Sequence, residues 1–259
     1  MNMEKKYSAP AVKKVLEILE LMARSNRSFT VSEISNELDI SVNSAFRIYK
    51  ELEEKDYVTK DPSDSSYELT PKLYYIGCSI KNNILFVKSA QPYMKKIRKY
   101  TGETVLLTIL SKENGTLVVD QMESKEPIKF LSTVGIVYDS YTSAMGKAML
   151  AELEEDEINE YLDKYKFIKK TDKTIIDKQI FKKELKKIAE SKVAFDKEEN
   201  FRGLSCIASA VFSGEGNLEG AIGISGLTFR MDEKTIEKYA EFIREQAEQF
   251  SASLGYEKR

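Results

Sequence analysis

Histidine is absent from the 259-residue sequence, and cysteine occurs only twice. Without histidine, the Ser-His-Asp and Cys-His mechanisms are excluded, and so are most zinc sites. Cys78 and Cys206 stand far apart in no paired spacing, which indicates free thiols in a reducing compartment. We therefore expect no catalytic residues, no metal and no cofactor, and we do not expect an enzyme.

Long apolar runs are also missing, and neither sign of charge dominates. No run approaches the roughly 20 residues that a membrane span needs, and residues 1–10 lack the apolar region of a signal peptide. We therefore expect a cytoplasmic protein that does not contact a membrane. The net charge is only −2, so a DNA-binding surface would have to come from sorting charges onto one face. The length suits two domains.

The N-terminal residues carry two helix patterns. Apolar residues recur at helical spacing between residues 11 and 24, which predicts a first helix. Thr30 is followed three residues later by Glu33, and this pair is typical of a capping box. The pair predicts a short second helix at 31–38.

A third helix and a hairpin follow directly. Ser41 can cap a helix over residues 42–55 after a short turn. Strands at 57–60 and 67–69, separated by a polar turn, are typical of a wing. This order of elements predicts a winged helix-turn-helix domain.

The third helix of such a domain presents its first polar residues to base edges in the major groove. Asn43 can pair with adenine, and Arg47 with guanine or with a phosphate. The expected contacts with double-stranded DNA are Ser41, Asn43, Ser44, Arg47 and Lys50, together with Lys60 of the wing. Two alternatives remain: the polar residues are only a solvated helix face, or the winged domain binds a protein in place of DNA.

The rest of the chain predicts an α+β domain built on a central antiparallel sheet. A helical stretch at 71–99, interrupted near Pro92, is expected to connect it to the first domain. Strands are expected at 104–110, 116–122, 127–131, 193–196, 204–212 and 218–225. Helices are expected at 143–153, 155–163, 177–191 and 232–254.

Several segments, in order along the chain, resemble the IclR family of bacterial transcription regulators. The resemblance extends from about residue 9 to residue 255. The segments are the third helix at 41–52, Tyr67-Glu-Leu69, Gly146-Lys-Ala148 within 143–151, the threonine pair of 171–175, the acidic residues of 196–199 with Gly203-Leu-Ser-Cys-Ile-Ala208, and the strand at 220–226.

The resemblance implies a GAF-like effector-binding domain, homodimers or homotetramers, and DNA binding tuned by a small metabolite, often an organic acid. It divides the chain into a winged helix-turn-helix domain at 1–70, a helical linker at 71–92 and an effector-binding domain at 93–259. The pocket positions that it implies are Ala144, Met145, Asp196, Cys206, Gly223 and Ser225. Met145 is longer than the residue common there and Gly223 lacks a common hydroxyl, so we expect one end of the pocket to be narrowed and another widened.

Elementary chemistry favours an anion at the same place. A helix that begins near Ser143 points free N–H groups and its positive dipole end outward, which suits a carboxylate. Cys206 and Ser225 lie on neighbouring expected strands and can face one cavity, and Asp196 can accept a hydrogen bond from an effector hydroxyl. Each residue also has an ordinary structural explanation: a small core cysteine, a surface carboxylate at a strand end, and a helix capped by its own serine.

The sequence therefore predicts a DNA-binding transcription regulator whose operator affinity is modulated by an organic or sugar acid. A phosphate loop is excluded at Gly146-Lys147, because Tyr141 stands where a glycine is needed and Ala148 where Ser or Thr is needed. Without a histidine, Cys206 is a poor nucleophile. The alternative is a metabolite-sensing or protein-interaction module without specific DNA binding.

Overall fold

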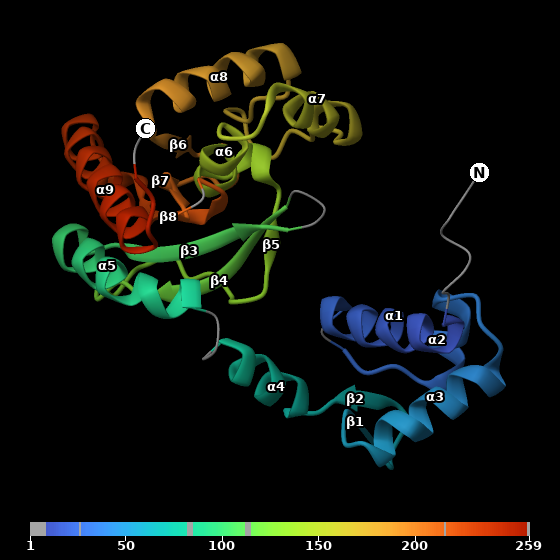
Figure 1. Ribbon diagram of the computed structural model, residues 1–259. Helices are drawn as coiled ribbons and strands as arrows, with labels where there is room; N and C mark the ends of the chain where they lie inside the picture. Colours follow the sequence, from blue (N-terminus) through green and yellow to red (C-terminus); the bar gives the residue numbers. More distant parts are fainter. Residues whose placement is uncertain (1–8, 26, 82–84, 112–114, 215, 258–259) are drawn as a thin grey trace. The chain divides into compact units, whose positions relative to one another are not determined.

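The chain divides into two compact units, Met1–Lys81 and Asn82–Arg259, which are described here one at a time. The structure is a computed structural model that describes residues 9–25, 27–81, 85–111, 115–214 and 216–257, with the side chains of 77–81 left out. Figure 1 shows the helices and strands of both units, coloured from blue at the N-terminus to red at the C-terminus.

Helices followed by a small hairpin make up the first unit (Figure 1). Its elements are α1 (Pro10–Ser25), α2 (Val31–Glu37), α3 (Val42–Glu54), β1 (Val58–Lys60), β2 (Tyr67–Leu69) and α4 (Lys72–Lys81). β1 and β2 pair antiparallel, with Val58 opposite Leu69. The predicted winged helix-turn-helix order is confirmed.

Side-chain caps fix where α2 and α3 begin. The Glu33 amide donates to Thr30 Oγ1 at 3.3 Å, and the Thr30 amide donates to Glu33 Oε2 at 2.7 Å, so the predicted capping box is present. Ser41 Oγ accepts from the Ser44 amide at 3.2 Å at the start of α3. Each cap satisfies a backbone donor that the first turn of a helix leaves unpaired.

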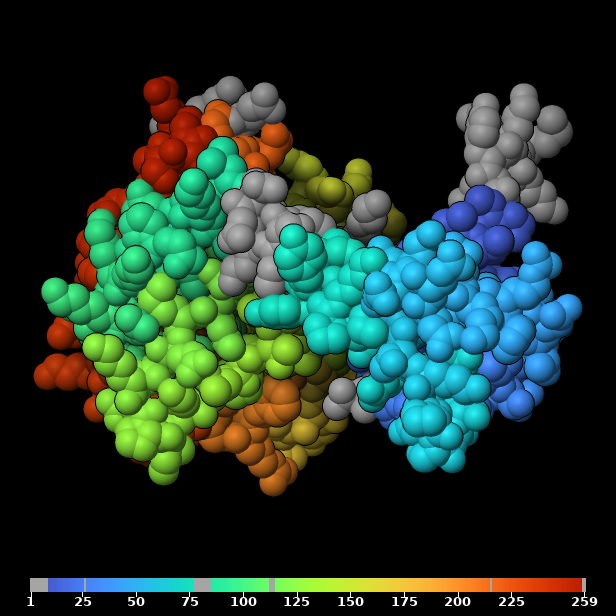
Figure 2. All heavy atoms as spheres, turned by 90° about the horizontal axis from the view of Figure 1, so that it is seen from below, coloured from blue at the N-terminus to red at the C-terminus, as the bar shows by residue number. Residues whose placement is uncertain are grey.

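The hairpin is fixed to α3 by aromatic packing. The rings of Tyr49 and Tyr67, both fully buried, stack with their centroids 4.2 Å apart. Phe29 and Tyr67 also exchange backbone hydrogen bonds of 3.0 and 2.8 Å. The hairpin therefore shares one core with α1–α3, and Figure 2 shows α3 and the hairpin, in light blue to cyan, as one continuous surface.

A six-stranded sheet in the order β5-β4-β3-β8-β7-β6 forms the centre of the second unit. Its strands are β3 (Thr104–Leu110), β4 (Thr116–Met122), β5 (Val137–Tyr138), β6 (Ala194–Lys197), β7 (Leu204–Phe212) and β8 (Leu218–Leu227). Every neighbouring pair in this sheet is antiparallel. The predicted fold class, α+β on a central antiparallel sheet, is confirmed.

Helices cover both faces of this sheet (Figure 1). α5 (Leu85–Thr101) and α9 (Glu233–Ser253) pack on one face, and α6 (Ala144–Leu150), α7 (Glu155–Lys164) and α8 (Lys178–Ser191) lie over the other. Successive side chains of β7 point to opposite faces of the sheet. Cys206 and Ala208 belong to the core under α6, whereas Ile207 and Val211 belong to the core under α5 and α9.

Pro92 does not interrupt the helix in which it lies, contrary to the prediction. α5 continues from Leu85 to Thr101 with Pro92 inside it. Its apolar face, which includes Phe86 and Met94, is buried against the sheet on both sides of the proline. Packing of this face outweighs the roughly 3 kcal/mol that an interior proline costs. The predicted start of the effector domain at residue 93 thus falls inside a helix whose first half already packs in that core.

The predicted strand at 127–131 is also wrong. These residues form a loop in which Ile128 is 67% exposed and Leu131 46% exposed, so their apolar side chains do not mark a buried strand face. A side chain of β3 fixes the position of the loop, because Thr104 Oγ1 donates a hydrogen bond to the Phe130 carbonyl at 2.8 Å. The strand at this edge of the sheet is the short β5, which pairs with the start of β4.

Candidate functional sites

The exposed face of α3 carries the predicted DNA-contact residues. Asn43 and Arg47 lie one turn apart in the solvent, while Ala45 and Tyr49 of the same helix are buried. Among the described residues, Arg47 has no ion-pair or hydrogen-bonding partner, so its guanidinium is free to bind a base or a phosphate. This face matches the geometry by which a recognition helix enters the major groove.

The other predicted DNA contacts are partly engaged within the protein. Ser41 and Ser44 share a hydrogen bond of 2.8 Å between their hydroxyls. Lys50 Nζ lies 2.7 Å from Glu53 Oε2, and this bond raises the pKa of Lys50. Lys60 lies over the ring of Tyr67 at 6.0 Å. Arg47 and Asn43 are therefore the members of the set best placed for direct base contacts.

Two exposed apolar side chains on α3 were missed in the sequence. Val42 is 55% exposed and Phe46 is 46% exposed, and both lie beside the Asn43–Arg47 row. Apolar side chains at such positions can contact the methyl group of thymine. The sequence did carry a signal for this surface: Phe46 lies outside the buried stripe of an otherwise amphipathic helix.

Three predicted effector-site residues form one row across neighbouring strands of the second unit. Asp196 of β6 lies opposite Cys206 of β7, and Cys206 lies opposite Ser225 of β8. Cys206 Sγ and Ser225 Oγ are 3.2 Å apart, and burial, together with the nearby Asp196 carboxylate, raises the pKa of the Cys206 thiol. Both Asp196 and Ser225 are only 2% exposed. Polar groups that converge beneath a helix are what a small-ligand site requires.

Ala144 and Met145 begin the seven-residue helix α6 on the same side of the sheet as this row. Ser143 caps the helix, with its Oγ accepting from the Gly146 amide at 3.4 Å, so the self-capping expected as the ordinary alternative does occur. Gly146 is required here, because a Cβ would lie 2.3 Å from the backbone of Ser140. α6 is therefore pressed onto the turn at 140–142.

Gly223 does not widen a cavity, contrary to the expectation. A Cβ at this position would lie 2.2 Å from the Ile207 carbonyl oxygen and 2.8 Å from Ala208. The neighbouring strand β7 therefore occupies the space that a side chain would need. Gly223 is explained by this close approach of two strands.

A buried ion pair beside the row was missed in the sequence. Lys147 of α6 is fully buried, and its Nζ lies 2.5 Å from Glu199 Oε1. Glu199 Oε2 is also buried and has no hydrogen-bonding partner among the described residues. The Glu199 amide donates to Asp196 Oδ1 at 2.6 Å, which joins the ion pair to the row. A lysine within the otherwise apolar helix Ala144–Leu150 was the signal that a buried carboxylate must face it.

Burial changes the acidity of this cluster. The pKa of Asp196 is raised to about 7, first by burial, with the hydrogen bond from the Glu199 amide acting in the opposite direction. Burial also raises the pKa of Glu199 and of the Cys206 thiol. Cys206 is therefore a neutral thiol at neutral pH, which suits hydrogen bonding better than nucleophilic attack.

Asp196 should make stability depend on pH. Because its pKa is higher in the folded chain than in the unfolded chain, its contribution is most favourable below pH 4 and is lost as the pH rises through about 7. Asp196→Asn removes this loss, so we expect the variant to gain about 2.5 kcal/mol of stability relative to the parent between pH 5 and pH 8, the interval that covers about two of the three pKa units of the shift. Urea unfolding at both pH values measures the difference, and parallel profiles for the two proteins would contradict it.

No helix of the described residues is long and apolar enough to cross a membrane. Within the same part of the chain, no cluster of three or more Cys, Asp or Glu side chains is arranged to hold a metal ion.

Comparison with known proteins covers nearly the whole chain. The model of the IclR helix-turn-helix domain matches residues 11–62, and the model of the bacterial transcriptional regulator IclR C-terminal domain matches residues 79–252. The HTH-type transcriptional repressor AllR of Escherichia coli K12 is 30% identical over 247 residues, which cover 95% of this chain and 91% of that protein.

Solved structures show the same similarity. The Thermotoga maritima IclR is 33% identical, with a TM-score of 0.73 over 95% of this chain and 98% of that chain. An IclR transcriptional regulator from Alicyclobacillus acidocaldarius has a TM-score of 0.84 over 95% of this chain and 99% of that chain, at 22% identity. The second likeness supports the fold alone.

Proposed function

The chain belongs to the IclR family of DNA-binding transcription regulators, and on that premise we propose that a small anionic metabolite bound in the second unit sets its affinity for operator DNA. The observation that carries the proposal is the buried row Asp196–Cys206–Ser225. A ligand rich in oxygen would exchange hydrogen bonds with the carboxylate, thiol and hydroxyl of this row.

The chemistry of the row suits an organic or sugar acid. The amides of Ala144 and Met145, at the start of α6, are the donors that we assign to the carboxylate of the effector. Asp196 is assigned to a hydroxyl or hydrate at the other end of the effector. At that distance its carboxylate would not repel the carboxylate of the effector. Met145, which is 2% exposed, would limit the length of the ligand. Similarity to a protein named a transcriptional repressor favours repression as the mode of action.

Two measurements test this function. The purified protein should shift DNA that carries its own upstream region, and one metabolite should abolish the shift. A thermal-stability screen of organic and sugar acids would find that metabolite, since a ligand at one hundred times its Kd stabilises by about 2.7 kcal/mol. A protein that shifts no DNA from its own upstream region would favour the alternative, a sensing or protein-interaction module.

The effector response should depend on the thiol and hydroxyl of the row. We expect Cys206→Val combined with Ser225→Val to abolish the response while operator affinity stays unchanged, because the variant removes polar groups and leaves α3 untouched. Thr108→Val is the matched control: Thr108 is a buried β3 residue outside the row, and it should respond normally. A double variant that still responds with the affinity of the parent would move the effector site elsewhere.

We propose that the protein binds DNA as a symmetric dimer formed through α1. Val12 is 58% exposed and Leu16 is 54% exposed, whereas Ile18 and Met22 on another face of α1 are buried. A second copy would cover this apolar row, and a two-fold protein reads a two-fold operator.

Leu16→Glu should therefore lower the mass measured by light scattering at micromolar concentration and weaken operator binding, because it places a charge in the proposed contact. Arg24→Glu introduces a carboxylate on the same helix outside the Val12–Leu16 row and should keep the parental mass. A parent protein that is monomeric when bound to DNA would contradict the proposal.

A further inference from the structure

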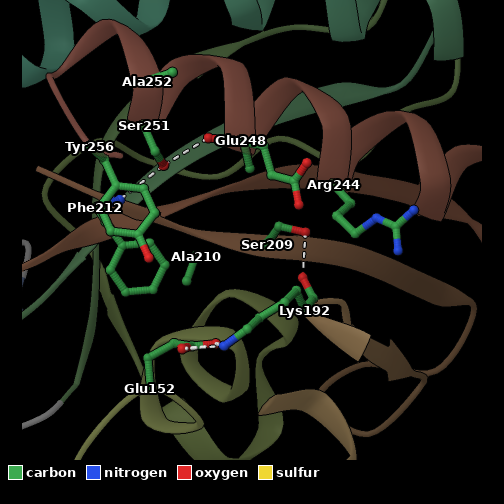
Figure 3. Close-up of a pocket in the computed structure, with 11 residues that line it drawn as sticks. Glu152, Lys192, Ser209, Ala210, Phe212, Arg244, Glu248, Ser251, Ala252 and Tyr256 are labelled. Atoms are coloured by element: carbon green, nitrogen blue, oxygen red, sulfur yellow. Dashed lines mark hydrogen bonds and ion pairs between the residues drawn. The ribbon is translucent and has the colours of Figure 1, made fainter. Parts of the chain in front are cut away.

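A cavity of about 330 Å³ lies in the second unit at the point where β6 ends beside β7. The pairing of β6 with β7 stops at Ala194 opposite Ala208, while β7 continues to Phe212. The chain turns away at Lys192, which has a left-handed φ of 60°, and Ser209 Oγ donates to the Lys192 carbonyl at 2.8 Å. Ser209, Ala210 and Phe212 therefore border a notch between β7 and α9 (Figure 3).

One end of this cavity is aromatic and is bounded by small side chains. The rings of Phe212 and Tyr256 stack with their centroids 5.2 Å apart. Ala210, Ala247 and Ala252 line the space beside them, and their short side chains are the reason that it stays open. The result is a flat apolar surface to which another ring or a short alkyl chain can pack.

The polar groups near the rings are already paired. Ser251 Oγ accepts from the Phe212 amide at 3.0 Å and donates to the Ala247 carbonyl at 2.8 Å. Lys192 Nζ contacts both carboxylate oxygens of Glu152, at 3.0 and 2.7 Å. Neither the serine nor the lysine therefore needs a ligand.

Arg244 is different. It is half-buried on α9 at the other end of the cavity from the two rings (Figure 3), and it has no acidic partner and no hydrogen bond among the described residues. A guanidinium in such a place is suited to binding a carboxylate through two parallel hydrogen bonds. Glu152 and Glu248 also line the cavity, so a dianion such as phosphate would be repelled more strongly than a single carboxylate, whose one charge Arg244 balances.

We propose that this cavity is a second ligand site, which takes a small amphipathic monocarboxylate. The carboxylate binds Arg244, and the ring or short alkyl body lies against Phe212 and Tyr256. The volume is at the lower end of the range of small-molecule sites, about 300–1,000 Å³. The cavity shares no residue with the Asp196–Cys206–Ser225 row, so the inference does not rest on the proposed effector site.

Binding can be observed directly at the cavity, because the methyl groups of three alanines line it. The full-length protein, labelled with ¹³C in its alanine methyl groups, is titrated with phenylacetate up to about 20 mM. We expect saturable shifts at Ala210, Ala247 and Ala252, and none at Ala144 beside the proposed effector site. Phenylacetamide, which has the same shape without the charge, should bind at least about tenfold more weakly.

Two variants distinguish the contribution of the Arg244 charge to binding from that of the cavity volume. Arg244→Gln should weaken phenylacetate binding about tenfold or more and leave phenylacetamide binding unchanged. Ala252→Phe fills the cavity from an exposed position on α9 and should abolish binding of both. Cys206→Val with Ser225→Val should leave phenylacetate binding as it is in the parent.

Three results would overturn the proposal: no saturable shift of the three methyl groups, an Arg244→Gln protein that binds phenylacetate like the parent, or shifts confined to the side of the sheet that carries Ala144. The last result would place phenylacetate in the proposed effector site. The variant with Cys206→Val and Ser225→Val changes only the proposed effector site, whereas the Arg244 and Ala252 variants change only the second site. A failure of one proposal can therefore be distinguished from a failure of the other.

Discussion

Lys147→Met is expected to lower the free energy of unfolding by about 3–5 kcal/mol at pH 8. Lys147 is fully buried, and its ammonium group lies 2.5 Å from Glu199 Oε1. Methionine keeps the length of the side chain and removes the charge. The carboxylate of Glu199 is then buried without a cation, close to a second carboxylate, that of Asp196.

The pH dependence of this loss identifies its cause. The pKa values of Glu199 and Asp196 are already raised by burial, so both groups take up protons more readily in the folded chain. Their contribution to stability therefore falls as the pH rises, and the deficit of Lys147→Met should be larger at pH 8 than at pH 5. Urea unfolding followed by far-ultraviolet circular dichroism at the two pH values measures it.

Two further variants complete the test. Adding Glu199→Gln to Lys147→Met should recover a large part of the loss, because the uncompensated charge is removed with its partner. Lys182→Met breaks an ion pair with the exposed Glu155 and should cost no more than about 1 kcal/mol. If Lys147→Met were as mild as Lys182→Met, the buried pair would not be holding α6 against the loop after β6.

The first unit could be predicted closely because its signals are local. The Thr30–Glu33 capping box and the Ser41 cap fix helix starts within one turn of sequence, and β2 has the bounds that its pattern indicates. Such signals need no knowledge of distant residues. The strand-turn-strand pattern of the wing likewise depends on neighbours along the chain.

The errors lie where distant contacts decide the structure. Pro92 remains helical because the two halves of α5 pack on one core, which no local pattern reveals. Residues 127–131 have the composition of a strand but are held as a loop by Thr104. Cys206 and Ser225 could be paired from the sequence because their strands are neighbours in a hairpin. Glu199 lies 52 positions from Lys147, and the cavity at Arg244 exists only because β6 is shorter than β7.

Arg47→Ala is expected to weaken operator binding by about 1–3 kcal/mol per half-site, and by about twice that if a dimer reads both halves. Arg47 is exposed on α3, and its guanidinium has no partner among the described residues. Lys50 is less available, since its ammonium group is 2.7 Å from Glu53. Loss of the free guanidinium therefore removes the strongest candidate for a bidentate contact with guanine on this face.

Fluorescence anisotropy of a labelled operator, repeated at several salt concentrations, distinguishes the two roles open to Arg47. If it reads a guanine, the loss should be confined to operators that keep that base, and specificity should relax at one position. If it holds a phosphate, affinity should fall on every sequence and the slope of affinity against salt should decrease by about one. Arg24→Ala, which removes the same side chain from α1 where it is paired with Glu20, is the control and should bind as the parent does. A folded Arg47→Ala protein with parental affinity would remove this face of α3 from the interface, and the wing would then have to carry recognition.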